Sequence, residues 1–248
     1  MMITIFTIAG SAVYAAEIPV SDQDQLITSS DWTEISNLQD EMKKEEPDAT
    51  IDYDKALKVY VDCNLIKLQT ADTKKLTSAL ESANYVWVIP FKMEKTYGMF
   101  TVAKGLPLRE EAKSVLTKAE QEEVKNHAGK WMITETAEHT VEPYYDILLE
   151  KREALSDCTR VVLVGSQPGM RQPVALGMDD ETARIWISLG YQYPVMKKIP
   201  ETQNVESGVY SFDSVAEISD TYIEDSEVST GAGVQSRSSM KYVAGIGI

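Results

Sequence analysis

The chain has 248 residues, of which 43% are hydrophobic and 25% are charged, so it can fold around one ordinary core or two small ones. Its 39 acidic residues outnumber the 24 basic ones and give a formal charge of −15, which repels phosphate backbones and argues against nucleic-acid binding. Two Cys and two His residues would make a zinc site only if all four converged, so we expect no metal site, and no cofactor motif is present.

The N-terminus has the pattern of a secretory signal peptide. Residues 1–16 are apolar and uncharged, and they end in small residues before a polar stretch. The small pair Val13 and Ala15 predicts cleavage after Ala15 or Ala16, which makes residues 1–15 the signal peptide. No Lys or Arg precedes the apolar run, and the alternative is a buried N-terminal strand. No Cys follows the run, so a lipid-modified cysteine is not expected at this end.

Residues 16–55 are predicted to be an N-terminal helical segment. The apolar residues that recur there at helical spacing are Trp32, Ile35, Leu38 and Met42.

Residues 56–108 are predicted to form a strand, a helix and a hairpin. The first strand alternates apolar Leu57, Val59 and Val61 with polar residues, which is typical of a half-buried strand. Asp72 can cap the helix that follows. The two hairpin strands are expected at 85–91 and 97–103.

Residues 109–200 are predicted to hold a linking helix and then the same order of elements. Thr117 and Glu120 have the spacing of a capping box at the start of the linking helix. The elements expected after it are strands at 131–135, 160–165, 172–178 and 183–189, and a helix from Pro143 to Leu155.

The fold class that these patterns predict is α+β, with a mainly antiparallel sheet and short helices on one of its faces. Corresponding elements begin at nearly equal spacings, which predicts two copies of a β-α-β-β unit. Convergence of two unrelated segments on one arrangement is the alternative, because few residues are identical between the two units.

The C-terminal part predicts a tether. Residues 201–240 are acidic and become rich in Ser and Gly, as in a solvated stalk, although Val215, Ile218 and Tyr222 have the spacing of a short amphipathic helix. Residues 241–248 begin an apolar tail, which could start a C-terminal membrane anchor. This layout resembles that of surface-attached proteins of Gram-positive bacteria, but the chain lacks an LPxTG sorting motif.

No catalytic motif is complete, so we predict no catalytic residues. Ser166 follows an apolar strand, but Val164 and Pro168 occupy the positions where a nucleophile elbow needs glycine. His127 and His139 do not form a His-Glu-x-x-His motif. Three adjacent acidic residues are predicted to lie in a solvated turn rather than across a cleft: Asp179, Asp180 and Glu181.

A sugar- or peptide-binding face is the candidate site. Its residues are Trp87, Trp186, Tyr191 and Tyr193. The alternative is that these aromatic side chains pack in the core or pair across strands.

The two cysteines allow two interpretations. Outside the cell, Cys63 and Cys158 would tend to be oxidised, and a disulfide between them would tie the two units together. Alternatively, each is a small buried thiol.

These features predict an exported extracellular module, held at the cell surface, that binds a protein, peptide or glycan without catalysis. The alternative is a cell-envelope hydrolase that uses carboxylates and a histidine, and geometry decides between them, because a hydrolase needs these groups together in a pocket.

Overall fold

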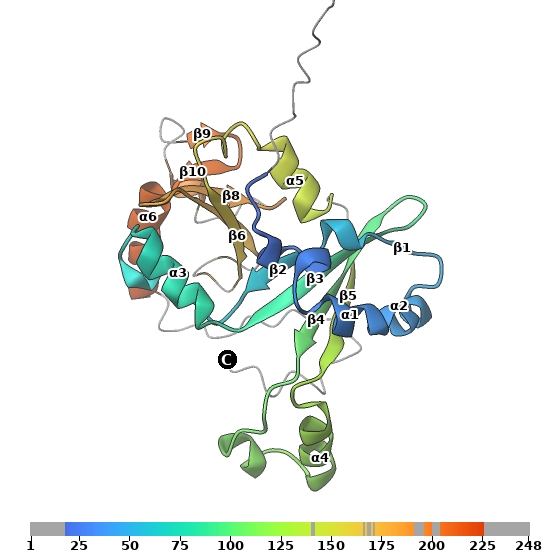
Figure 1. Ribbon diagram of the computed structural model, residues 1–248. Coiled ribbons are helices and arrows are strands. Elements are labelled where there is room, and N and C mark those ends of the chain that lie inside the picture. Colours follow the sequence, from blue (N-terminus) through green and yellow to red (C-terminus); the bar gives the residue numbers. More distant parts are fainter. Residues whose placement is uncertain are drawn as a thin grey trace, which may run out of the picture.

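The computed structural model describes residues 18–139, 142–165, 167, 170, 172–190, 196–199 and 204–225 (Figure 1). The strands are β1 (Thr50–Ile51), β2 (Leu57–Tyr60), β3 (Tyr85–Lys92), β4 (Tyr97–Lys104), β5 (Trp131–His139), β6 (Arg160–Val164), β7 (Val174–Met178), β8 (Ala183–Ser188), β9 (Asn204–Glu206) and β10 (Val209–Ser211). The α-helices are α1 (Trp32–Ile35), α2 (Gln39–Glu45), α3 (Thr73–Glu81), α4 (Lys118–His127), α5 (Tyr144–Glu150) and α6 (Phe212–Asp225).

In the described part of the chain, ten strands form one sheet, and the α+β class with a mostly antiparallel sheet is confirmed. Its strand order is β5-β4-β3-β2-β6-β7-β8-β10-β9, and β1 pairs with β3 beyond the N-terminal end of β2. The pairing of β2 with β6 is parallel and joins the two halves of the sheet. The other named strand pairs are antiparallel.

The sheet order does not repeat the predicted β-α-β-β unit. In the first unit, β2 and β3 flank α3 and lie side by side. In the second unit, β5 pairs with β4 whereas β6 pairs with β2, so three strands separate the two strands that flank α5. Equal spacing along the sequence sets the lengths of the elements but not which strands pair.

Helices pack on both faces of the sheet rather than on one. Side chains of α3 and α6 share a core with Val162 and Trp186, while α1 and α2 cover Trp87 on the same face. On the opposite face, α5 packs against Val161 and Leu163. Alternate residues of β6 therefore point into different cores, so both faces of this central strand are buried.

The N-terminal segment lies between β2 and β6 where these two strands separate. These two strands pair only near their C-terminal ends, at Val59 with Leu163 and at Tyr60 with Val164. At their N-terminal ends, Val20 forms a bridge to Val161, and Gln25 forms a bridge to Leu57. The segment thus passes from the α5 face to the α3 face and closes the sheet.

Residues 204–225 are part of the folded domain and not of a stalk. Strands β9 and β10 extend the sheet beyond β8. Helix α6 buries Phe212 and Val215 in the core that contains α3. The amphipathic spacing at Val215 and Ile218 therefore marks a real helix, and Asp213 and Glu217 are exposed on its other faces. The rest of the predicted stalk, 201–203 and 226–240, and the tail at 241–248 lie outside the described residues.

Helix α4 and the preceding 3₁₀ turn (Glu111–Ser114) project from the ends of β4 and β5 (Figure 1). The predicted capping box is present, because Glu120 N–H donates to Thr117 Oγ1 while the Glu120 carboxylate accepts from Thr117 N–H at 2.8 Å. None of the helices in the described residues has the length and apolar character that a membrane crossing needs.

Gly177 in β7 provides a first test of the packing under α5. A methyl group at this position would lie 2.8 Å from Cys158 Sγ and 3.1 Å from Leu155 Cδ2. We expect Gly177→Ala to lower the free energy of unfolding by about 1–2 kcal/mol, because overpacking a filled core forces neighbours to move. Urea unfolding measures this change. The additional substitution Cys158→Ala should recover part of the lost free energy of unfolding. A double variant that is no more stable than Gly177→Ala alone would contradict the described packing.

Candidate functional site

A pocket of about 240 Å³ opens at one end of the sheet, where β2 and β4 end and β3 and β5 begin. Apolar side chains form most of its wall, among them Val61, Val86 and Leu106. Two aromatic residues, Tyr85 and Trp131, line it, and their ring centroids are 5.9 Å apart. A concave, mainly apolar site with a few polar groups is the usual form of a ligand-binding pocket.

Close backbone contacts shape the floor of the pocket. Gly105 N–H donates to the carbonyl of Lys130 at 2.9 Å, and Gly129 N–H donates to the carbonyl of Gly105 at 2.7 Å. A methyl group on Gly105 would overlap the carbonyl of His127. Gly105 is therefore required where the chain leaves β4 and passes the end of α4.

Polar groups lie at two ends of this pocket. Asn84 Nδ2 donates to Asp62 Oδ2 at 3.0 Å beside the end of β2. Asp62 itself has a φ of 58°, a left-handed conformation that Asp tolerates better than most residues. Lys104 lies at the end of β4, directly opposite Trp131 in the β4–β5 register, with Nζ 5.5 Å from the indole ring.

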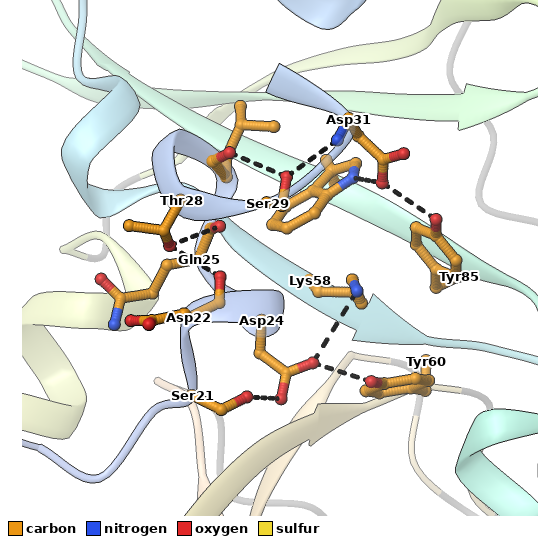
Figure 2. Close-up of polar contacts among 12 residues, drawn as sticks. Ser21, Asp22, Asp24, Gln25, Thr28, Ser29, Asp31, Lys58, Tyr60 and Tyr85 are labelled. Atoms are coloured by element: carbon orange, nitrogen blue, oxygen red, sulfur yellow. Dashed lines mark hydrogen bonds and ion pairs between the residues drawn. The ribbon is translucent and has the colours of Figure 1, made fainter. Parts of the chain in front are cut away.

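A buried charge cluster between the N-terminal segment and the sheet includes Tyr85, which also lines the pocket (Figure 2). Lys58 of β2 is enclosed by aromatic rings, with Nζ 4.5 Å from the Tyr85 centroid, 5.2 Å from Trp87 and 5.9 Å from Tyr60. Its nearest carboxylate oxygen is Asp24 Oδ1 at 4.0 Å. Burial lowers the pKa of Lys58 from its ordinary value, while Asp24 opposes this shift.

The carboxylates of this cluster bind the N-terminal segment to the sheet. Asp24 is 2% exposed and accepts hydrogen bonds from Tyr60 Oη at 2.7 Å and Ser21 Oγ at 2.6 Å. It also forms an ion pair with Arg160 at 3.0 Å. Together these contacts join the segment to both β2 and β6.

Asp31 makes the link between the cluster and the pocket. Its Oδ2 accepts from Tyr85 Oη at 2.9 Å and from Trp87 Nε1 at 3.0 Å. Burial and the hydrogen bond to Asp31 raise the pKa of Tyr85. Because Tyr85 also lines the pocket, the cluster fixes one of its walls in place.

The predicted aromatic face is not exposed where the structure describes it. Trp87 and Trp186 are both 0% exposed, and each packs in a core cluster on the sheet. The core interpretation of these strand aromatics therefore holds for both. Tyr191 and Tyr193 lie outside the described residues.

Cys63 and Cys158 are both buried and free, so the structure contains no disulfide between them. Cys63 follows the C-terminal end of β2 and packs with α3, whereas Cys158 precedes the N-terminal end of β6 and packs with α5. Since β2 and β6 run parallel, the two thiols lie at opposite ends and on opposite faces of the sheet. A disulfide needs Cα atoms within about 7 Å.

The buried thiols predict an alkaline loss of stability. Burial raises the pKa of both Cys63 and Cys158 to about 11 from an ordinary value of 9.0. Above pH 9 the unfolded chain loses thiol protons that the folded chain keeps, so the free energy of unfolding should fall as the pH rises toward 11. The expected drop between pH 8 and pH 10 is about 2–3 kcal/mol for the pair.

Urea unfolding across this pH range, with Cys63→Ala/Cys158→Ala as the comparison, measures the drop. In the double variant most of this pH-dependent drop should be absent. A pH profile equal to that of the unsubstituted chain would contradict the assignment to the thiols. Thiol titration of the unfolded, unreduced protein should give two reactive groups per chain.

Among the described residues, those considered for catalysis do not converge, whereas Ser166 and the side chain of His139 lie outside what the structure describes. His127 Nδ1 lies 2.8 Å from the carbonyl of Glu123 on the same helix. Asp179 accepts from the N–H groups of Glu181 and Thr182 and pairs with Arg184, so it organises the β7–β8 turn. Within the described ranges no three His, Cys, Asp or Glu residues gather as a metal site requires.

Sequence patterns did not indicate the pocket or the charge cluster. Val61, Asn84, Lys104 and Trp131 come from four segments and share no motif. A lysine alternating with apolar residues in β2 looked like part of a solvated strand face, yet Lys58 points into a buried cluster.

Comparison with known proteins gives no relative for this chain. No protein-family model, no curated protein and no solved structure matches it.

Proposed function

We propose that this chain is an exported module, held at the cell surface, that binds an extracellular protein, peptide or glycan without catalysis. The observation that carries the proposal is the pocket at the end of the sheet, with its apolar wall and its Tyr85 and Trp131 side chains. Such a pocket suits one apolar side chain of a peptide or protein. Glycan binding usually relies on exposed aromatic faces, and the two described candidates for such a face are buried.

Binding rather than hydrolysis fits the polar groups of the pocket. Of the described residues that line it, Asp62 is the carboxylate, and none is a histidine. Hydrolysis by carboxylates and a histidine would need a second carboxylate or a histidine across the cleft. The hydrolase alternative therefore has no support from this geometry.

The proposal of export rests on the apolar N-terminal stretch and its small residues. Cleavage after Ala15 or Ala16 would leave Ile18 and Val20, which are buried against the sheet, in the mature chain. The proposal of a surface tether rests on the polar stretch and apolar residues near Ile248.

The binding proposal can be tested with peptide and glycan arrays. We expect the chain to bind to peptides on the array. Leu106→Trp, which fills the pocket, should weaken this binding at least tenfold. Leu68→Trp is the matched control, because Leu68 is 43% exposed and does not line the pocket. Binding that survives Leu106→Trp unchanged would overturn the assignment of this pocket.

The export proposal is tested separately. The full chain expressed in a Gram-positive host should appear outside the cytoplasm with an N-terminus at Ala16 or Glu17. A cytoplasmic protein that keeps Met1 would overturn it.

A further inference from the structure

Lys58 and Asp24 form a buried pair of an amine and a carboxyl group (Figure 2). Their side chains are 11% and 2% exposed, and Lys58 Nζ lies 4.0 Å from Asp24 Oδ1. Aromatic rings flank the Lys58 amine, with the centroids of Tyr85 and Trp87 at 4.5 and 5.2 Å from Nζ. The two groups that an amide bond joins are therefore held side by side in the interior of the protein.

Burial favours the uncharged forms of both groups, which are the forms that react. Only a neutral amine is a nucleophile, and burial lowers the pKa of Lys58. The pair of Lys55 and Asp146 shows the contrast. Its N–O distance is only 2.8 Å, but its side chains are 34% and 25% exposed, and the hydrogen bond to Asp146 raises the pKa of Lys55. Lys55 therefore stays an ammonium, whereas Lys58 can pass a proton to the carboxylate beside it.

Hydrogen-bond donors hold the Asp24 carboxyl group in a fixed position. Its Oδ1 accepts from Tyr60 Oη at 2.7 Å. Its Oδ2 accepts from Ser21 Oγ at 2.6 Å and from Arg160 Nη2 at 3.0 Å. When an amine attacks a carboxyl carbon, negative charge develops on one oxygen, and fixed donors at that oxygen lower the barrier. Ser21 and Arg160 supply such donors at Oδ2, which makes Oδ1 the oxygen that leaves.

We propose that Lys58 and Asp24 become joined in the folded chain by an amide bond between Nζ and Cγ, with loss of one water molecule. The Lys58 ammonium gives a proton to Asp24 Oδ1, and the resulting amine attacks Cγ. A second proton then passes from the nitrogen to Oδ1, and the Cγ–Oδ1 bond breaks to release water. The two opposite charges cancel, so the reaction needs no oxidant, reductant or other reactant.

The fold supplies what this condensation lacks in solution. Bulk water opposes amide formation, but two groups fixed in the right geometry react as if each were present at about 10⁵ M or more. Attack requires the nitrogen and carbon to be about 3–3.5 Å apart, and the flexible stem of Lys58 permits this approach. The bond ties the N-terminal segment to β2 in a way that does not depend on redox conditions, in a chain whose two cysteines are free.

Mass spectrometry of the purified, folded chain tests this proposal. We expect a mass one water molecule below that of the sequence, and fragmentation should place the link between Lys58 and Asp24. Trypsin does not cleave after an amidated lysine, so residues 56–67 should appear as one peptide, attached to the peptide that ends at Lys43. Cleavage after Lys55 should be normal, because its ion pair is solvated.

Variants assign the loss of water to individual groups. Lys58→Arg should have the full mass of its sequence, because a guanidinium keeps the positive charge but stays protonated and does not attack. Tyr60→Phe keeps the ring but removes the donor at the leaving oxygen, so it should slow the loss of water after synthesis several-fold. Lys55→Arg is the matched control and should lose water as the unsubstituted chain does.

The unsubstituted chain carries the deciding signal, so the result does not depend on whether a variant folds. A folded chain with the full mass and a tryptic peptide that ends at Lys58 would overturn the proposal. A loss of water that persists in Lys58→Arg, or a link that fragmentation places at other residues, would also overturn it. Neither residue of the bond lines the pocket, so these outcomes are independent of the proposed binding function.

Discussion

Replacing Asp24 by alanine is expected to lower the free energy of unfolding by about 3–5 kcal/mol, the usual cost of removing one partner from a buried ion pair. Asp24 is 2% exposed, and its carboxylate contacts Tyr60 and Lys58 (Figure 2). It also pairs with Arg160 at 3.0 Å. Without it, the cations of Lys58 and Arg160 lose their closest buried counter-charge. The N-terminal segment also loses its main polar contact with the sheet.

Asp22→Ala is the matched control for this prediction. Asp22 lies two residues away in the same 3₁₀ turn but is exposed, so its replacement should change the free energy of unfolding by no more than about 0.5 kcal/mol. Urea unfolding of both variants measures the difference. Similar stabilities for the two variants would show that the buried cluster does not hold the N-terminal segment in place.

Gly98→Ala is expected to lower the free energy of unfolding by about 3 kcal/mol, at the upper end of the usual cost of overpacking. Gly98 in β4 pairs with Phe91 in β3, and a methyl group there would overlap the Phe91 ring. Phe91 cannot move away easily, because it is 1% exposed and its ring centroid is 4.6 Å from that of Phe100. Chemical denaturation gives the change directly.

Gly165→Ala provides the comparison for Gly98. A methyl group at this buried glycine would meet Val61 Cγ1 at 3.4 Å, an ordinary contact, so a change within about 1 kcal/mol is expected. A double variant, Gly98→Ala with Phe91→Leu, should cost less than the sum of the two single changes, because the smaller side chain removes the overlap. If the changes in the free energy of unfolding of the two single variants add up in the double variant, the Phe91 ring does not cover Gly98.

Local features of the fold could be predicted from the sequence because their causes lie within a few residues. Asp72 caps α3, with its carboxylate accepting from the N–H groups of Lys74 and Lys75. The capping box at Thr117 and the β3–β4 hairpin formed where expected. The N-terminal helix was predicted as one element, but a 3₁₀ turn at Ser36–Leu38 divides it into α1 and α2.

Long-range features could not be predicted in the same way. The order of the sheet depends on β6 pairing with β2 instead of β5, and no residue near either strand specifies that partner. The buried cluster joins Asp24 to Lys58 and Arg160 across 34 and 136 residues, and each of these residues alone looks like ordinary surface charge. The pocket likewise exists only because the ends of β2, β3, β4 and β5 meet.

The most direct test of the pocket as a ligand site is the indole N–H region of a ¹⁵N-correlated NMR spectrum. The chain has four tryptophans, and Trp87 Nε1 is bonded to Asp31 while that of Trp131 has no partner. On titration with a peptide that the array experiment identifies, the Trp131 signal should move progressively because its ring lines the pocket, and the signals of Trp87 and Trp186, buried in their cores, should stay in place. A Trp131 signal that does not move while the others shift, or no shift at all, would contradict binding at this pocket.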